Sequence, residues 1–177
     1  MSITLVSRRD HTASPSFVRD FKSSMALNAS TVAIICCEFE GVRYGLSATS
    51  VVSLSVDPPS VLTCIGQNAE AHAPMCEARA FSVSFLTASQ NSISDRFAGL
   101  AGERNEQKFV GAKWIRGDLG TPVLENAAFA LECEVAESYR IFSHTVIAGI
   151  VRSIWRSGEM KPLIYYNRKY SSLVADG

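Results

Sequence analysis

The stretch Gly45–Pro59, with the sequence GLSATSVVSLSVDPP, says more about the fold of this chain than any other segment. Short hydroxyl side chains alternate with aliphatic ones along it, which is the pattern of a half-buried β-strand. Such a strand lets a flat ligand approach the backbone, with amide and hydroxyl donors free to meet it. Pro58-Pro59 has no N–H to give to a sheet, so strand pairing must end there. The same residues also fit an ordinary Ser/Thr-rich edge strand followed by a turn.

Strands predominate on both sides of this stretch. After a flexible tail, residues 1–13, Ser14-Pro15 favours the start of a helix of about three turns. Residues 31–39 and 42–56 are predicted to form a hairpin that turns at Glu40-Gly41. Further strands are expected at 60–66, 81–85, 127–135, 145–155 and 162–170, with a short helix near 70–78, a helix capped by Ser89 that runs to Ala98, and a long loop at 99–120. Successive strands with few helices predict a mainly β domain, an antiparallel barrel or sandwich, over residues 14–177.

Residues 127–135 give the clearest strand pattern. The apolar side chains of this segment fall on one face, whereas Glu132 and Glu134 fall on the other. Alternation of this kind is typical of a β-strand, whose successive side chains point to opposite faces.

Composition limits the possible partners. The chain has 177 residues, with 47% hydrophobic and 19% charged residues, as expected for one folded domain. Lys+Arg and Asp+Glu are both 17, and no basic run stands out, so nucleic acid is not an expected partner. A near-neutral protein has little charge repulsion between copies, which favours a homo-oligomer.

Five cysteines, an odd number without Cys-x-x-Cys spacing, predict buried thiols in a reducing compartment. Cys76 lies in a polar stretch and is the one expected to be exposed. No His or Cys pair shows ligand spacing for a metal, and no apolar run is long enough to span a membrane. The N-terminus lacks the apolar core of a signal peptide. These features together predict a cytoplasmic protein.

Motifs that are absent exclude several classes of protein. No two glycines are separated by a single residue, so the chain has no Gly-x-Gly-x-x-Gly dinucleotide fingerprint. It also has no P-loop and no Gly-x-Ser-x-Gly nucleophile elbow. A nucleotide cofactor, if bound, must be held without a Rossmann fold.

Several segments together resemble the flavin-reductase-like family, the small reductases that feed reduced flavin to two-component monooxygenases. The most specific are the Asp57-Pro58-Pro59 turn, Gln90 with Asp95–Ala98, Leu131–Cys133 and Tyr166–Tyr170. The order and spacing of these segments extend the resemblance over residues 17–173.

This resemblance implies a homodimeric, six-stranded antiparallel split β-barrel of Greek-key type. It also implies hydride transfer from NADH or NADPH to FMN or FAD, with the reduced flavin passed to a partner monooxygenase. One alternative is a reductase of another acceptor on the same fold, such as a cob(II)yrinic acid a,c-diamide reductase. Another is a flavin-binding protein without turnover.

The resemblance also implies where the flavin lies. It runs along the hydroxyl-rich stretch, and the following strand and loop line its other edge. The residues expected to bind the cofactor there are Leu46, Ser47, Ala48, Thr49, Ser50, Val51, Ser53, Cys64, Ile65, Gly66, Ala69 and Ala71. Arg96 and Phe97 are expected near the ribityl phosphate or the ring, since a flavin phosphate needs an arginine or a cluster of hydroxyls.

The C-terminal residues Tyr166, Asn167, Arg168, Lys169 and Tyr170 allow two interpretations. They can form a basic, aromatic strand edge, or, by the resemblance, hold the dinucleotide at a dimer interface. In the second case the two cations meet a pyrophosphate and a tyrosine stacks on a ring.

His144 is the predicted catalytic residue. In the family a histidine at this place lies beside the nicotinamide, within a Gly-Asp-His segment. Here the segment reads Phe142-Ser143-His144, without the Gly-Asp pair. Of the other two histidines, His11 lies in the tail, and His72 reaches flavin only through the loop.

Overall fold

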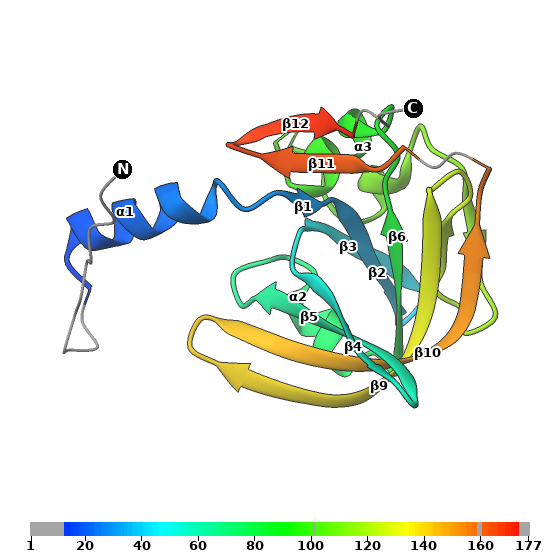
Figure 1. Ribbon diagram of the computed structural model, residues 1–177. Coiled ribbons are helices and arrows are strands. Elements are labelled where there is room, and N and C mark those ends of the chain that lie inside the picture. Colours follow the sequence, from blue (N-terminus) through cyan, green and yellow to red (C-terminus); the bar gives the residue numbers. More distant parts are fainter. Residues whose placement is uncertain (1–12, 101, 159–160, 174–177) are drawn as a thin grey trace.

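β-Strands are the predominant secondary structure of the molecule, shown in Figure 1 as a computed structural model that describes residues 13–100, 102–158 and 161–173. The helices are α1 (Pro15–Met25), α2 (His72–Glu77), α3 (Asn91–Phe97) and the 3-10 helix η1 (Asn105–Phe109). The strands are β1 (Ser30–Thr31), β2 (Ala33–Phe39), β3 (Val42–Ala48), β4 (Val51–Val56), β5 (Pro59–Gly66), β6 (Ala80–Phe85), β7 (Trp114–Arg116), β8 (Pro122–Leu124), β9 (Phe129–Ile141), β10 (His144–Arg156), β11 (Leu163–Tyr166) and β12 (Lys169–Ser172). The predicted tail, apart from Ala13, lies outside the described residues.

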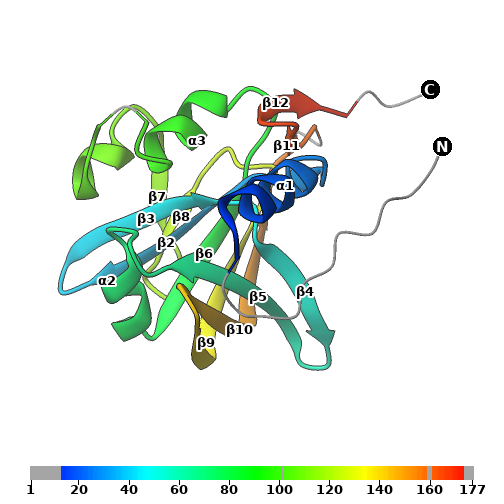
Figure 2. The ribbon, with the colours of Figure 1, turned by 90° about the vertical axis from the view of Figure 1, so that its left-hand side faces the viewer.

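Seven antiparallel strands form the main sheet in the order β3-β2-β6-β9-β10-β5-β4. Its two edge strands, β3 and β4, are joined by only two residues, Thr49 and Ser50. The sheet therefore curls until its edges meet at this corner, as Figure 2 shows. The resemblance implied six strands, whereas this sheet has seven. Residues 42–56 were predicted to form a single strand. They are two strands, at opposite edges of the sheet.

Three other predictions need correction. Ser89 does not cap α3; Gln90 occupies the N-cap position, and its side chain accepts from Thr87 N at 2.9 Å. The predicted loop 99–120 contains η1 and β7. Residues 162–170 form part of the hairpin β11–β12, because the chain reverses at Asn167 and Arg168, both with positive φ.

The core lies on both faces of β2. Ala33, Ile35 and Cys37 belong to one buried cluster, which α2 covers with Met75. Val32, Ile34 and Cys36 belong to a second cluster, with Phe97 of α3, Phe109 of η1, Leu124 of β8 and Leu163 of β11. Burial on both faces explains why residues 31–39 read as a continuous apolar run instead of an alternating one.

Glu132 lies on the polar face of β9, and this residue is nevertheless fully buried. Its carboxylate accepts hydrogen bonds from Asp118 N (2.7 Å), Leu119 N (3.0 Å), Thr121 Oγ1 (2.8 Å) and Trp155 Nε1 (3.3 Å). The alternating pattern correctly separates the faces of the strand, but the loop between β7 and β8 covers the polar one. Glu134, two residues further along the same strand, is exposed.

The free thiols are mostly inert, as the composition predicted. Cys36, Cys37 and Cys133 are buried, and no disulfide forms among the described residues. Burial raises the pKa of Cys37 and of Cys133 to about 12, so both remain protonated near neutrality. Cys76 is partly exposed, and so is Cys64.

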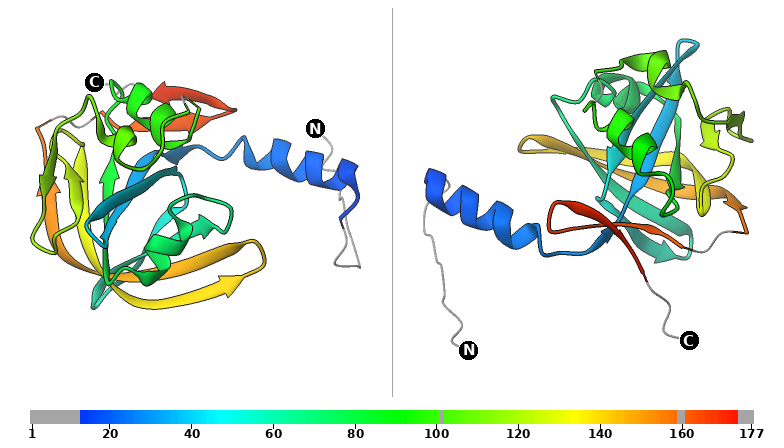
Figure 3. Two further views of the ribbon diagram at one scale, coloured as in Figure 1. Left: turned by 180° about the vertical axis from the view of Figure 1, so that it is seen from behind. Right: turned by 90° about the horizontal axis from the view of Figure 1, so that it is seen from above.

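Helix α1 stands away from the sheet, as Figures 1 and 3 show. Ser14 caps it, accepting from Phe17 N at 3.3 Å, as predicted. Phe21 and Met25 recur at the spacing of one helix face, as a buried apolar face would require. No residue of the helix is buried, however, and these two side chains are 59% and 50% exposed. Within the described ranges, no helix is long and apolar enough to cross a bilayer.

Candidate ligand-binding site at the corner of the sheet

Two adjoining cavities lie along the C-terminal half of β3, at the corner where the sheet edges meet. The first has a volume of about 710 Å³ and the second about 420 Å³. Ser47 and Ala98 line both, so the two cavities adjoin across these residues. β3 is an edge strand, and one row of its N–H and C=O groups has no neighbouring strand to pair with.

Small residues form much of the first cavity. Its walls include Gly45 and Leu46 of β3, the loop 68–71 that follows β5, and Ala98-Gly99 at the end of α3. Gly45 lets α3 approach β3 closely, because a Cβ there would lie 2.6 Å from the ring of Phe97. Phe97 itself is 2% exposed, so it supports the wall and has no free face for stacking.

Charged side chains gather at the outer end of the first cavity. Lys108, which is 8% exposed, places its Nζ 3.1 Å from an oxygen of Glu70. Arg104 and Glu103 line the same end. A buried ammonium with one carboxylate partner can still bind a second anion, so this end fits a phosphate group.

Helix η1 is held on β3 by a second pair of charges. Arg43 on β3 donates to Glu106 on η1 through its backbone N–H (2.8 Å) and its Nε (2.9 Å). The guanidinium hydrogen bond lowers the pKa of Glu106, and Arg43 also lies 4.5 Å from the ring centre of Phe109. Because the pKa of Glu106 is lowered, the pair stabilises the fold above the usual glutamate pKa and loses this effect in acid.

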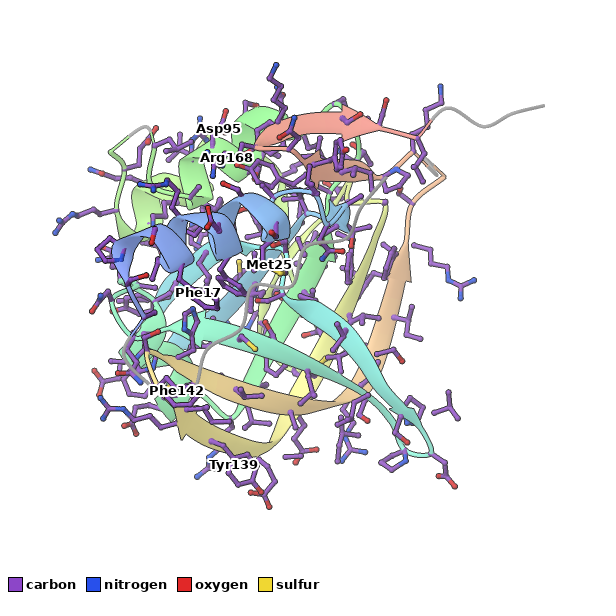
Figure 4. All side chains as sticks on the ribbon, turned by 60° about the vertical axis from the view of Figure 1, so that its left-hand side comes forward. Phe17, Met25, Asp95, Tyr139, Phe142 and Arg168 are labelled. Atoms are coloured by element: carbon purple, nitrogen blue, oxygen red, sulfur yellow. The ribbon has the colours of Figure 1, made fainter. Side chains whose placement is uncertain are left out.

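The C-terminal hairpin and α3 form the second cavity with β3. Ala48 and Thr49 line one side, and Arg168, Lys169 and Tyr170 line the other. In Figure 4, Asp95 on α3 and Arg168 at the turn of the hairpin lie at the same end of the molecule. Neither Arg168 nor Lys169 forms an ion pair within the described residues, so both cations are available to an anionic ligand.

Tyr170 fastens this hairpin to α3. Its Oη lies 2.8 Å from Asp95 Oδ1 and 3.0 Å from Ser94 Oγ, and Ser94 Oγ lies 2.8 Å from Ser47 Oγ. Desolvation, and secondarily the neighbouring Asp95, raises the pKa of Tyr170. The phenol is therefore a hydrogen-bond partner of α3, and the predicted stacking of a tyrosine on a ligand ring remains a prediction.

Half of the predicted cofactor-binding residues come together at this corner. Those that line the cavities are Leu46, Ser47, Ala48, Thr49, Ala69, Ala71, Phe97, Arg168, Lys169 and Tyr170. Those that line neither cavity are Ser50, Val51, Ser53, Cys64, Ile65, Gly66, Arg96, Tyr166 and Asn167. Ser50 donates to Cys64 O at 3.0 Å, and Ile65 is fully buried in the core. Arg96 donates to Val110 O and pairs with Glu103, so it supports the loop that follows α3.

His144 also lies apart from both cavities in the single chain. It is exposed at the start of β10, opposite Gly66 of β5, and its Nδ1 is 3.0 Å from Ser143 Oγ. His72 is bound to Thr145 Oγ1 at 2.8 Å. The role predicted for His144 therefore remains a prediction.

Three charged residues that line the first cavity were missed in the sequence: Glu103, Arg104 and Lys108. All three lie in the segment 99–120, which was interpreted as a long loop. The available signal was a charged run, Glu103 to Lys108, directly after the glycines that follow Arg96-Phe97.

Comparison of the sequence with known proteins shows the family of this chain. The sequence profile of the flavin reductase like domain matches residues 25–174. The chain belongs to the flavin reductase like family. The FMN reductase (NADH) RutF of Pseudomonas syringae pv. syringae (strain B728a) is 30% identical over 156 residues, which are 88% of this chain and 86% of that protein. The 4-hydroxyphenylacetate 3-monooxygenase reductase component of Salmonella typhi is 32% identical over 150 residues, 85% of this chain and 88% of that protein.

Solved structures share the fold. Flavin reductase PheA2 in its native state superposes with a TM-score of 0.81 at 27% identity, covering 88% of this chain and 97% of that one. A nitrilotriacetate monooxygenase component B homologue from Mycobacterium thermoresistibile gives 0.81 at 28% identity, covering 89% and 87%. The predicted family and the mainly β flavin reductase fold are therefore confirmed, and the relatives' names agree with the predicted flavin and nicotinamide cofactors.

Proposed function

We propose that this protein is an NAD(P)H-dependent flavin reductase that reduces FMN or FAD and supplies the reduced flavin to a partner monooxygenase. The observation that carries the proposal is the pair of adjoining cavities along residues 45–48 of edge strand β3, with Lys108 lining the first cavity and Arg168 and Lys169 lining the second. The names of the relatives support flavin as the acceptor and a monooxygenase as the partner.

The residues present fit a flavin. The unpaired backbone groups of β3 offer hydrogen bonds to a flat polar ring, and the small side chains of Ala48, Ala69 and Ala98 leave room for it. Lys108 at one end and Arg168 with Lys169 at the other are suited to phosphate. A bound flavin supplies an acceptor for hydride, and such a transfer depends on proximity and stacking more than on a protein acid or base. The absence of a triad motif in the sequence is consistent with this chemistry.

Steady-state assays test the reaction. With excess FMN or FAD, the purified protein should oxidise NADH or NADPH through many turnovers, because the flavin exchanges after each cycle. Turnover that requires a cobalamin-type acceptor would support the alternative reductase instead. Flavin binding without any NADH or NADPH oxidation would contradict an enzymatic role.

We also propose that two copies associate. Helix α1 exposes Phe21 (59%) and Met25 (50%), and the tip of the β9–β10 hairpin exposes Tyr139 (58%) and Phe142 (93%), the last two marked in Figure 4. Edge strand β4 adds the exposed side chains of Val52, Leu54 and Val56. A monomer rarely leaves so many large apolar groups uncovered, and the chain carries no net charge to keep copies apart.

Light scattering at micromolar concentration tests the dimer. The wild-type protein should have about twice the chain mass of 19.2 kDa. A Phe21→Asp variant should shift towards the monomer, since it places a charge on the exposed apolar side of α1. An Arg19→Asp variant changes a charge on the same helix and serves as the control. A monomeric wild type would contradict the proposal.

A cytoplasmic location is part of the same proposal. Five cysteines without a disulfide among the described residues are typical of a reducing compartment. An NADH- or NADPH-dependent enzyme would also find its reductant there.

A further inference from the structure

A chain of four polar side chains lines the second cavity and ends on β3 at Ser47, which lines both cavities. It begins at Asp95 of α3 and passes through Tyr170 of β12 and Ser94 of α3 to Ser47 of β3. The three oxygen–oxygen distances are 2.8, 3.0 and 2.8 Å. Ser94 is 1% exposed, so water does not compete for its hydroxyl. Three separate elements therefore meet in one short hydrogen-bond chain.

Each hydroxyl has only one proton, and this limit determines which group donates each hydrogen bond in the chain of side chains. A hydroxyl or a phenol donates one hydrogen bond, whereas a carboxylate only accepts. If Tyr170 donated to Ser94, two lone pairs would face each other across the 2.8 Å contact with Asp95, one of them on a charged group. Tyr170 therefore donates to Asp95. The raised pKa of Tyr170 is consistent with a phenol that keeps its proton beside a carboxylate.

The donors of the other two hydrogen bonds follow from this assignment. The Tyr170 oxygen can then only accept from Ser94, which is 3.0 Å away. Since Ser94 has given its single proton to Tyr170, the 2.8 Å contact between Ser94 and Ser47 requires Ser47 to donate to Ser94. Ser47 has no proton left for the cavities that it lines, and only lone pairs face them.

We propose that Asp95, Tyr170 and Ser94 hold Ser47 Oγ as an obligate hydrogen-bond acceptor for a donor group of the bound flavin. Tyr170 is then a positioning residue, which acts on the ligand through two other hydroxyls. The inference rests on the proposed function, because it requires flavin at this corner. Two groups of FMN can donate there, the ring N–H at N3 and a ribityl hydroxyl.

A double-mutant cycle on FMN affinity tests the proposal. Ser47→Ala should weaken FMN binding by about three- to tenfold, the usual effect of one hydrogen bond. Tyr170→Phe should weaken it at least as much, because Ser94 must then donate to Ser47 and turn the Ser47 proton towards the cavity. In the Ser47→Ala background, Tyr170→Phe should have no further effect.

The same double-mutant cycle also gives the result that would contradict the proposal. Equal losses from Tyr170→Phe in both backgrounds would show that the phenol only braces the hairpin. Tyr44→Phe, on β3 but packed against the first core cluster, is the control and should keep wild-type affinity. If Tyr170→Phe does not fold, Asp95→Asn takes its place in the cycle, since its amide can donate to Tyr170 and reverse the chain. Absence of FMN binding by the wild type would overturn the proposed function and this inference together.

FMN methylated at N3 distinguishes the two donors. If the ring N–H is the donor, the preference of the wild type for FMN over 3-methyl-FMN should fall in the Ser47→Ala variant. If a ribityl hydroxyl is the donor, this preference should be the same in both proteins, while the cycle with FMN still shows the coupling.

Discussion

An Ala98→Trp variant is expected to bind FMN at least roughly 100-fold more weakly than the wild type while unfolding at nearly the same temperature. Ala98 lines both cavities and is exposed at the end of α3, so an indole there occupies ligand space without entering the core. The loss is expected to be large because the added ring removes volume at the point where the two cavities adjoin. Turnover of NADH with FMN should fall in parallel.

Fluorescence titration with FMN and thermal unfolding measure the two expected effects. Ala136→Trp is the matched control, since it adds the same ring at an exposed position of β9 outside both cavities. Ala48→Trp, which narrows only the second cavity, adds an independent variant in case the indole at position 98 turns towards solvent. Wild-type FMN affinity in folded forms of both site variants would place the flavin elsewhere.

A Glu132→Ala variant is expected to lower the free energy of unfolding by at least about 3 kcal/mol, because it leaves four donors without their shared acceptor. Three of those donors belong to residues 118–121, which link β7 to β8. Gly117 leaves space for the carboxylate, since a Cβ there would come within 2.3 Å of its oxygens. Glu132→Gln should lose less, because the amide keeps one accepting oxygen but points its NH₂ at donors.

Urea unfolding gives the comparison. The control is Glu134→Ala, two residues along the same strand, where an exposed carboxylate pairs with Arg152 at 2.6 Å. That change should alter stability by less than about 1 kcal/mol. Equal effects at the two positions would mean that Glu132 is not the anchor of this loop.

Periodicity predicted the strands well where a single face decides the pattern. It placed the hairpin at Glu40-Gly41, the turn at Pro58-Pro59 and the strand 81–85 within a residue or two of their actual bounds. It failed at Thr49-Ser50, because a strand that changes from one sheet edge to the other keeps its alternation. Nothing local marks the point where hydrogen bonding passes from β2 to β5.

The candidate site also contains residues that the sequence predicted and residues that it missed. Residues 46–49 of the hydroxyl-rich segment each line at least one of the two cavities, and the flavin predicted along them remains a prediction. Its continuation through Val51 and Ser53 was included because it lies next in sequence, yet β4 runs along the far edge of the sheet. Lys108 was missed because its partner Glu70 is far away along the chain and meets it only in the fold.

The sequence by itself determined the strand-rich class, the family and the segment that borders the site, since these depend on side-chain patterns within short stretches. Only the tertiary structure decided which of those residues share a cavity, that Glu132 is buried, and that Tyr170 acts through Ser94 on Ser47. Each of these depends on segments distant in sequence meeting at one place: α3 and β12 against β3, and the 117–121 loop against β9. The local sequence pattern predicts to which face of a strand a side chain points. Which group that side chain then contacts depends on how the sheet curls.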